Sequence, residues 1–389
     1  MSTPAEMVTA IRQLFGKHFG NADILVRSPG RINLIGEHTD YNLGFVLPAA
    51  IDKAIYIAIK KREDQEIHLV AGDLGQQYQS SLNALVSSDL QWPNYILGVV
   101  EKMRQAGFRL SGFEAVVMGD VPLGAGLSSS AAVECATAFA LNTLFELGLD
   151  KIQMVQLAQK AENEFVGVQC GIMDQFASMF GKKQHVIKLD CRSLEYAYMP
   201  FDTSHIRILL FDTGVKHSLA SSEYNLRRLE CEAGVAIIRK KFPQVQSLRD
   251  ADITMVETCL SDQDPKVYMR CKYMVEEIQR LQEGCEDLQQ HDLDSFGKKM
   301  FATHAGLSKL YEVSCPEADN LVKWVTDHPA VIGARMMGGG FGGCTINIVR
   351  KEMADTLIQT VSKLFEETYQ HPLKTYIVSI DEGTSLIEN

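Results

Sequence analysis

The sequence predicts a two-domain α+β protein, and three observations lead to that fold class. The chain has 389 residues, which is longer than one hydrophobic core usually extends, so we expect two domains. Strand-like and helical periodicities occur together in both halves of the chain. The run IRILLFDTG at 206–214 is typical of a strand that begins a new unit. We therefore place the boundary near residue 205, with domains over 1–205 and 206–389.

Each element of the first domain follows from its own pattern. The first stretch, 1–20, has the period of a helix. Runs rich in β-branched residues and bounded by turn residues predict strands at ADILVRS, AIYIAIKKR, EIHLVAG, FEAVVMG, QHVIKLD and EYAYMPF. Ala and Leu occupy nearly the whole circumference of 129–147, which predicts a buried helix, and an amphipathic helix is expected at 151–167.

The second domain combines longer, charged helices with a few strands. Helical periodicity predicts helices at 223–241, 267–285, 292–311 and 351–370. Strands are expected at IGARMMG, CTINIV and the terminal KTYIVSI.

Composition excludes several classes of protein. A net charge of −11 with only short basic clusters argues against nucleic-acid binding. No apolar run reaches the roughly 18 residues that a membrane helix needs, and the N-terminus lacks the plan of a signal peptide. Nine cysteines without a C-x-x-C pair predict reduced thiols and no zinc site. We expect a cytoplasmic monomer that acts on small molecules, with neither a nucleic-acid nor a membrane partner.

The stretch GRINLIGEHTDY at 30–41 carries more polar groups than folding requires. Residues 31–35 alternate as a half-buried strand does, after the turn signal Pro29-Gly30, and a polar loop follows Gly36. Five hydrogen-bonding side chains should therefore converge on a small volume: Arg31, Asn33, Glu37, His38 and Asp40. Burying such groups without partners costs about 1–3 kcal/mol each. They need either a complete internal network or a ligand rich in hydroxyl groups.

The stretch GDVPLGAGLSSSAAVECA at 119–136 has the features of an anion site. Gly124 and Gly126 allow the backbone to approach a ligand closely, and three serines stand at the start of a helix. Free N–H groups and the helix dipole favour a phosphate there. The alternative is a tight turn with one serine as N-cap. No Walker motif occurs, and GGGFGG at 338–343 is followed by a strand, so it is not a dinucleotide fingerprint. Those glycines would instead let the second domain pack against a ligand or the first domain.

Two carboxylates stand out in AENEFVGVQCGIMDQFASMFG at 161–181. Glu162 lies towards the end of an amphipathic helix, and Asp174 follows an apolar segment that should partly desolvate it. Such a carboxylate can act as a base or orient a hydroxyl. Taken alone, an Asp ahead of QFASMFG is better explained as the N-cap of a helix.

Together, GRINLIGEHTDYN, PLGAGLSSSAA, CGIMDQF and GGGFGGC resemble the GHMP family of small-molecule kinases, and most closely its members that phosphorylate galactose. The resemblance extends over essentially the whole chain, with the motifs in the right order. It implies an N-terminal domain with a mixed sheet and a phosphate loop, a C-terminal α/β domain, and an active site in the cleft between them.

The resemblance also implies a role for each matching residue. Asp174 matches the catalytic carboxylate, and Arg31 would keep it ionised. The sugar-binding positions correspond to Glu37, His38, Asp40, Gly171 and Tyr224. The adenine pocket corresponds to Trp92 and Tyr95, and the phosphate loop to Gly124, Ala125, Gly126, Leu127, Ser128, Ser129 and Ser130. The magnesium ligands correspond to Ser130 and Glu162.

One position departs from the family pattern. Met337 stands where a Thr is common before the C-terminal glycines. A thioether cannot replace a hydroxyl donor, so any contact made by that Thr is in doubt here.

The implied reaction is transfer of the γ-phosphoryl group of ATP to the C1 hydroxyl of α-D-galactose, with Mg²⁺ as cofactor. Two alternatives remain. The same chemistry could serve N-acetylgalactosamine, or the chain could be a non-catalytic sugar sensor that binds galactose and ATP.

Overall fold

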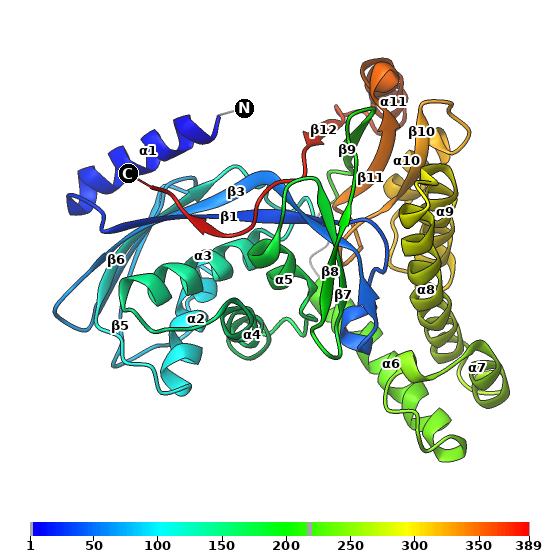
Figure 1. Cartoon of the computed structure of the whole chain (residues 1–389), viewed down its shortest axis with the longest axis horizontal. Helices are drawn as coiled ribbons and strands as arrows, with labels where there is room; N and C mark the ends of the chain where they lie inside the picture. Colours follow the sequence, from blue (N-terminus) through cyan, green and yellow to red (C-terminus); the bar gives the residue numbers. More distant parts are fainter. Residues whose placement is uncertain (1–2, 216–219, 389) are drawn as a thin grey trace.

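The computed structural model describes residues 3–215 and 220–388, and places a sheet-rich part beside a helix-rich part (Figure 1). The larger sheet has the strand order β13-β1-β3-β6-β4-β5, in which neighbours are antiparallel except β4 and β6. Its strands are β1 (Ile24–Asn33), β3 (Pro48–Lys61), β4 (Glu66–Ala71), β5 (Gln76–Ser81), β6 (Phe113–Gly119) and β13 (Ser385–Leu386). This mixed sheet is the one expected for the first domain.

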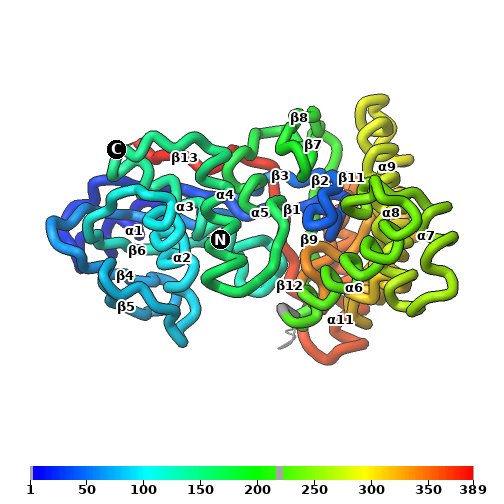
Figure 2. Tube along the Cα trace, turned by 90° about the horizontal axis from the view of Figure 1, so that it is seen from below, coloured from blue at the N-terminus to red at the C-terminus, as the bar shows by residue number. Residues whose placement is uncertain are grey.

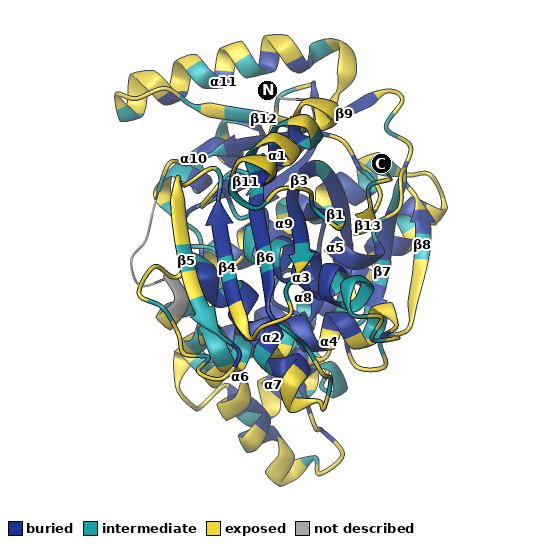
Figure 3. Cartoon of the chain, turned by 90° about the vertical axis from the view of Figure 1, so that its left-hand side faces the viewer, coloured by how far each residue is buried: buried dark blue, intermediate teal, exposed yellow. Residues whose placement is uncertain are grey.

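Helices cover both faces of this sheet. α1 (Pro4–Phe19) lies on one face and begins with a capping box in which Thr3 and Glu6 bond each other's backbone. The opposite face carries α2 (Trp92–Gln105), α3 (Ser129–Leu144), α4 (Lys151–Ala161) and α5 (Met173–Phe180) (Figure 1). The central strands are buried and β5 is more exposed, as an edge strand usually is (Figure 3). The predicted buried helix is confirmed, because α3 is enclosed between the sheet and its neighbouring helices.

A small sheet and a second α/β unit complete the chain. β2 (Phe45–Val46), β7 (His185–Asp190) and β8 (Tyr196–Pro200) pair in the order β2-β7-β8. The second unit has the strand order β10-β11-β9-β12, all antiparallel. Its strands are β9 (Ile206–Asp212), β10 (Val331–Met336), β11 (Cys344–Arg350) and β12 (Lys374–Val378). Its helices are α6 (Ala220–Lys241), α7 (Ile253–Leu260), α8 (Pro265–Gln289), α9 (Leu293–Lys309), α10 (Pro316–Val325) and α11 (Ala354–Tyr369).

The two parts share a hydrophobic core, since Ile57 of β3 and Ile346 of β11 belong to one cluster of buried residues. The end of the chain also crosses back, because β13 pairs with β1 (Figure 2). The domain boundary near residue 205 stays a prediction, and β13 is one of the segments that sequence patterns did not indicate. Those segments also include β5, α2, α7 and α10.

The prediction for the start of the polar stretch is wrong. Pro29-Gly30 was expected to be a turn, with a new strand over 31–35. Instead β1 continues to Asn33 through a register shift between Pro29 and Arg31. A Cβ on Gly30 would lie 2.6 Å from the carbonyl oxygen of Leu127. The glycine therefore lets the phosphate loop approach the strand, and the Arg31 N–H donates to that same carbonyl at 3.1 Å.

The amphipathic helix expected at 151–167 ends in an irregular turn. α4 stops at Ala161, and a π-helical turn, η2 (Glu162–Val166), follows. Such turns occur often at functional sites. In the described residues, 3–215 and 220–388, no helix is both long and apolar enough to cross a membrane.

Candidate active site

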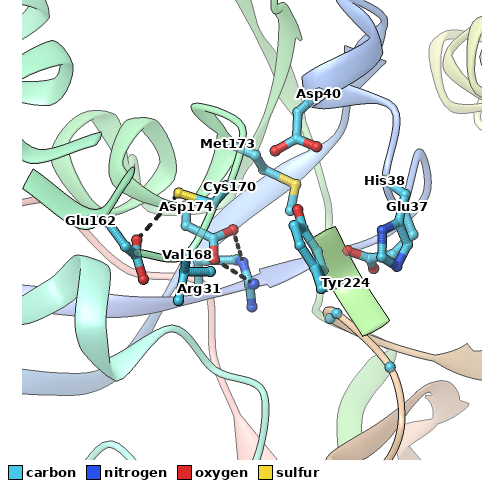
Figure 4. Close-up of a pocket in the computed structure, with 13 residues that line it drawn as sticks. Arg31, Glu37, His38, Asp40, Glu162, Val168, Cys170, Met173, Asp174 and Tyr224 are labelled. Carbon is cyan, nitrogen blue, oxygen red and sulfur yellow. Dashed lines mark hydrogen bonds and ion pairs between the residues drawn. The ribbon is translucent and has the colours of Figure 1, made fainter. Parts of the chain in front are cut away.

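A pocket lies where β1, its following loop, α5 and the C-terminal glycine loop meet (Figure 4). It is lined by Arg31, Glu37, His38, Asp40, Glu162, Val168, Cys170, Met173, Asp174, Tyr224 and Gly338–Gly340. Residues from both halves of the chain form it, and the expected sugar-binding and catalytic residues line it, except Gly171.

Arg31 and Asp174 form a two-point ion pair at the centre of this pocket. Arg31 Nε lies 2.7 Å from Asp174 Oδ1, and Nη2 lies 2.8 Å from Oδ2. The Ser128 hydroxyl also donates to Asp174 Oδ2, and Arg31 Nη1 donates to the Gly126 carbonyl at 2.6 Å. Burial would lower the pKa of Arg31, but the carboxylates around it, Asp174 first, raise it overall. Arginine therefore stays charged beside a fixed carboxylate.

The alternative reading of Asp174 as a helix N-cap is wrong. Asp174 lies inside the first turn of α5, whose N-cap is Ile172 and has no side-chain cap bond. Its carboxylate instead faces Arg31 in the pocket. The residue thus has no capping role that would account for its position.

Glu37 is held by a residue from the second half of the chain. Arg335 is fully buried, and its Nη1 lies 2.7 Å from Glu37 Oε2. The same guanidinium donates to the carbonyls of Asn33 and Leu34. Charged hydrogen bonds of this kind fix a loop firmly, so β10 positions the polar loop that follows β1.

His38 has one satisfied and one unsatisfied ring nitrogen. Nδ1 lies 2.8 Å from the Tyr41 hydroxyl, whereas Nε2 is buried without a hydrogen-bond partner. Burial, followed by the charges of Arg227 and Arg335, lowers the pKa of His38 to about 3. The imidazole is therefore neutral, and His38 lines the pocket as a neutral residue.

Asp40 and Gly171 are matched by close packing. A Cβ added to Gly171 would lie 2.1 Å from Asp40 Oδ2, so a side chain at 171 would displace the carboxylate. Burial, and then the charge of Asp174, raises the pKa of Asp40 to about 7. Burial therefore outweighs the backbone hydrogen bonds from Tyr41 and Met173, which lower this pKa.

One residue of the expected polar group does not belong to the pocket. Asn33 is fully buried, and its side-chain oxygen accepts from the Leu47 N–H at 3.3 Å. It supports the loop rather than facing a ligand. The remaining four, Arg31, Glu37, His38 and Asp40, do converge as expected.

A second pocket lies beside the phosphate loop and is mostly apolar. Trp92 and Tyr95 of α2 line it together with Leu123, Ser129 and Ser130. The indole Nε1 of Trp92 is buried and has no hydrogen-bond partner. The expected adenine and phosphate segments therefore lie next to each other, around one cavity that suits a flat, partly apolar ring.

The phosphate loop has the backbone of an anion site. Gly124 and Gly126 have φ of +77° and +75°, in the region that favours glycine. Ser128 occupies the N-cap position of α3 but makes no side-chain cap bond there. The alternative of a simple serine cap is therefore not what the structure contains. The first N–H groups of α3 remain available to an anion.

The C-terminal glycine loop packs on this phosphate loop. A Cβ on Gly338 would meet the Gly126 carbonyl oxygen at 3.4 Å, which agrees with the expected contact between the domains. Met337 is buried, and its N–H donates to the Cys344 carbonyl. Its thioether lies in the core rather than in either pocket.

Ser130 and Glu162 connect the two pockets. Ser130 lines the apolar pocket, Glu162 lines the polar one, and their side chains hydrogen-bond each other. Burial, and then the charge of Asp174, raises the pKa of Glu162. A hydroxyl and a carboxylate in this arrangement are hard oxygen ligands of the type that Mg²⁺ prefers.

Sequence reasoning missed two residues at this junction. Gln175 Nε2 donates to Glu162 Oε2 at 2.6 Å and to Glu134 Oε2 at 3.0 Å. Glu134 is fully buried one helical turn after Ser130, and burial and then Glu162 raise its pKa well above the usual range. The spacing of Ser130 and Glu134 could have revealed it, since residues four apart share a helix face. Two buried carboxyl groups side by side fit a nearby cation. Within the described chain, no cluster of three His, Cys, Asp or Glu side chains suited to a metal was found.

Comparisons with known proteins agree with this geometry. Residues 94–182 match the model of GHMP kinases N terminal domain, and residues 285–367 match GHMP kinases C terminal. Residues 13–61 match the galactokinase galactose-binding signature. A galactokinase from Roseiflexus sp. is 37% identical over 97% of this chain and 96% of its own length.

Solved structures give the same result. Lactococcus lactis galactokinase, complexed with galactose, superposes with a TM-score of 0.93 at 33% identity, covering 97% of this chain and 99% of that one. A mevalonate kinase superposes with a TM-score of 0.66 at 19% identity, covering 92% of this chain and 100% of that one, which indicates a common fold. The fold is that of a GHMP kinase. Within that class, the chain belongs to the galactokinase family.

Proposed function

We propose that this chain transfers the γ-phosphoryl group of ATP to the C1 hydroxyl of α-D-galactose, giving galactose 1-phosphate and ADP. The observation that carries the proposal is the Arg31–Asp174 pair in a pocket with the polar loop of the galactose-binding signature. The names of the curated relatives, and the galactose in the Lactococcus lactis structure, support galactose as the substrate.

The pocket residues suit phosphoryl transfer to a sugar hydroxyl. Asp174 would orient the C1 hydroxyl and accept its proton, and the Arg31 guanidinium would hold that carboxylate ionised and neutralise charge on the transferring group. Such reactions depend mainly on positioning and charge stabilisation. The side chains of both residues are fixed by two hydrogen bonds to each other before substrate arrives.

The nucleotide would occupy the apolar pocket. Trp92 and Tyr95 would flank the adenine, and the loop over 124–130 would hold the phosphates through backbone N–H groups at the start of α3. Ser130 and Glu162 would hold Mg²⁺, which when bound supplies charge stabilisation to the β- and γ-phosphates. Gln175 and Glu134 support Glu162 from behind.

The polar loop would select the sugar. His38 and Asp40 line the pocket with polar groups, and the buried charge of Asp40 calls for further hydrogen-bond partners. Hydroxyl groups of galactose would supply them, which explains why so many polar side chains gather after β1. Gly171 leaves room for Asp40, and Tyr224 closes the pocket from α6 (Figure 4).

One assay separates galactose from the two alternatives. The protein is incubated with ATP, Mg²⁺ and a panel of sugars, and ADP release is measured. We expect rapid release with galactose and little with N-acetylgalactosamine. Faster turnover of N-acetylgalactosamine would reassign the substrate, and binding without ADP release would make the chain a sensor.

We also infer a cytoplasmic monomer. The nine cysteines carry free thiols, which is typical of a reducing compartment. Light scattering of the purified protein tests the monomer, and fractionation of the cells that express it tests the location.

A further inference from the structure

A line of hydroxyl groups runs from the pocket into the second half of the chain. The Tyr41 hydroxyl lies 2.8 Å from His38 Nδ1 and 2.8 Å from the Tyr311 hydroxyl. The Tyr311 hydroxyl in turn lies 3.3 Å from Cys231 Sγ. Tyr41 belongs to η1 (Asp40–Asn42), Tyr311 follows α9, and Cys231 lies in α6. The line of contacts therefore links the imidazole of His38 to Tyr311 and Cys231, which do not line the pocket themselves.

His38 needs such support because its conformation is unusual. Its φ is +68°, which a residue with a side chain seldom adopts without surrounding contacts. The imidazole packs among three tyrosine rings, with centroid distances of 5.7 Å to Tyr41, 5.2 Å to Tyr224 and 5.0 Å to Tyr311. These contacts fix the plane of the ring. They leave open which nitrogen carries its proton.

The direction of the hydrogen bonds along this line determines which ring nitrogen of His38 carries the proton. A neutral imidazole has one donor and one acceptor nitrogen, and the pKa of about 3 keeps His38 neutral. Burial raises the pKa of Cys231 to about 12, so the sulfur keeps its proton and can donate it to Tyr311. The Asn42 side chain also hydrogen-bonds that sulfur and opposes the shift, as a donor does. With this direction each hydroxyl donates towards His38.

Hydrogen bonds donated in the opposite direction, from His38 towards Cys231, would be weaker at both ends of the line. This direction would have Nδ1–H donate to a phenol oxygen and end on sulfur, which is a weak acceptor. The favoured direction ends with a phenol O–H donating to an imidazole nitrogen, a stronger acceptor. The Gly339 carbonyl lies near enough to raise the pKa of His38 somewhat, as an acceptor of a ring N–H does, although Nε2 forms no hydrogen bond of normal geometry.

We propose that Tyr41 and Tyr311 are positioning residues that hold His38 in the tautomer protonated at Nε2, so that Nε2–H faces the Gly339 carbonyl and the ring keeps its place in the wall of the sugar pocket. This inference rests on the proposed function for the identity of the sugar. It adds a dependence of sugar binding on Tyr311, a residue of the second half that lies behind the pocket.

The tautomer can be observed without any sugar. Two-bond ¹H–¹⁵N spectra of protein labelled at its ten histidines distinguish the two neutral forms, and His38→Gln identifies the His38 signals. We expect the wild-type protein to show Nε2–H alone, and Tyr41→Phe to show a mixture of tautomers. A wild-type His38 protonated at Nδ1, or an unchanged spectrum in Tyr41→Phe, would overturn the proposal.

Binding measurements complete the test. Loss of one neutral hydrogen bond typically changes an equilibrium about three- to tenfold, so Kd for galactose should rise by that factor in Tyr41→Phe and in Tyr311→Phe, with KM for ATP unchanged. Tyr369→Phe, which removes a hydroxyl bonded to Asn320 in the second half, is the matched control and should leave both values unchanged.

Two failures remain distinguishable. If the wild-type protein does not bind galactose, the proposed function fails, while the spectra still report the tautomer. If galactose binds equally well to wild type, Tyr41→Phe and Tyr311→Phe, the positioning role fails and the proposed function stands.

Discussion

The two adjoining pockets are built in different ways. The apolar pocket is formed entirely by the first half of the chain, mainly from α2, β6 and the start of α3. The polar pocket needs both halves, because Tyr224 and the glycine loop complete it and Arg335 holds Glu37 from behind. One pocket depends on shape and backbone, and the other on buried charges in fixed positions.

Because of this difference, the two pockets should differ in how strongly each discriminates between similar ligands. An apolar cavity tolerates small changes, since a methylene there is worth about 1–3 kcal/mol. A pocket of buried polar groups discriminates far more, because a ligand with a misplaced hydroxyl leaves those groups unpaired. Substitutions in the polar pocket should therefore have the larger effects.

The largest effect should be the rejection of glucose. Galactose and glucose differ in the orientation of the C4 hydroxyl, and Asp40 is the buried carboxylate that we expect to accept from it. The wild-type kcat/KM for galactose should exceed that for glucose by about 10⁴–10⁵. Asp40→Ala should lose most of this galactose activity with little change in KM for ATP. Comparable rates on both sugars would show that the loop does not recognise this hydroxyl.

Asp174→Asn should lower kcat by about 10²–10⁴, the usual range for a positioned proton acceptor. Galactose binding should persist, because the loop that contacts the sugar is unchanged. Steady-state kinetics and calorimetry measure the two quantities. Asp212→Asn, at the end of β9 and outside both pockets, is the control. Near-normal turnover in Asp174→Asn would remove this carboxylate from the mechanism.

Ser130→Ala and Glu162→Gln should raise the Mg²⁺ concentration needed for half-maximal activity, by about 10–100-fold, because each removes or weakens one oxygen ligand. Titration of Mn²⁺ by paramagnetic relaxation with ATP present measures binding apart from turnover. Gln153→Ala, which removes a capping side chain at the start of α4, controls for damage to that helix. Unchanged metal dependence in both variants would contradict the assignment.

Galactose affinity should fall as pH drops below about 7. Asp40 has a pKa of about 7, mainly through burial and the charge of Asp174, and its protonated form is a weaker acceptor for the sugar hydroxyl than the carboxylate. The loss should approach tenfold per pH unit and should disappear in Asp40→Asn. Because the folded state favours the protonated form, Asp40 itself stabilises the fold below pH about 4, and this contribution is lost as pH rises to about 7. A Kd independent of pH in the wild type would contradict this account.

The smallest effect should come from the apolar pocket. Trp92→Leu removes an aromatic face from the adenine site, and KM for ATP should rise about three- to tenfold, in line with the worth of one aromatic contact. Galactose binding should not change. The other tryptophan, Trp324, packs against Phe365 and Tyr369 in the second half, so Trp324→Leu tests for a general loss of stability. A change in galactose Kd with Trp92→Leu would show that the pockets are coupled.

Local patterns predicted much of the fold but not its closure. Helices such as α3 and strands such as β3 and β6 follow from periodicity, because their side chains face one core. β13 is too short to carry a pattern, and it forms through pairing with β1 far away in the chain. Pro29-Gly30 resembled a turn in the sequence, but the structure has a register shift of β1 there. The shift lets the Leu127 carbonyl approach Gly30, and a tertiary contact of this kind leaves no local sequence pattern.

The candidate site shows the same limit. Arg31, Asp174 and the polar loop were evident from residue types that folding alone does not explain. Glu134 was missed because an acid inside an alanine-rich helix looks like a surface residue until its partner is known, and that partner, Gln175, lies 41 residues further along the chain. Arg335 was missed because its contacts with Glu37 and with the carbonyls of Asn33 and Leu34 join segments 298 to 302 residues apart.

The return of the chain to β1 has a consequence for synthesis on the ribosome. Arg27 of β1 bonds the Glu382 carbonyl and Asp381, some 355 residues later in the sequence, and Ser28 bonds Thr384. Until that segment has emerged, one edge of the first sheet is unpaired, and an open edge invites pairing with other chains. The nascent protein therefore carries an incomplete first domain through almost its entire translation. Chaperones that shield exposed strands should matter most in the seconds before residues 379–387 appear.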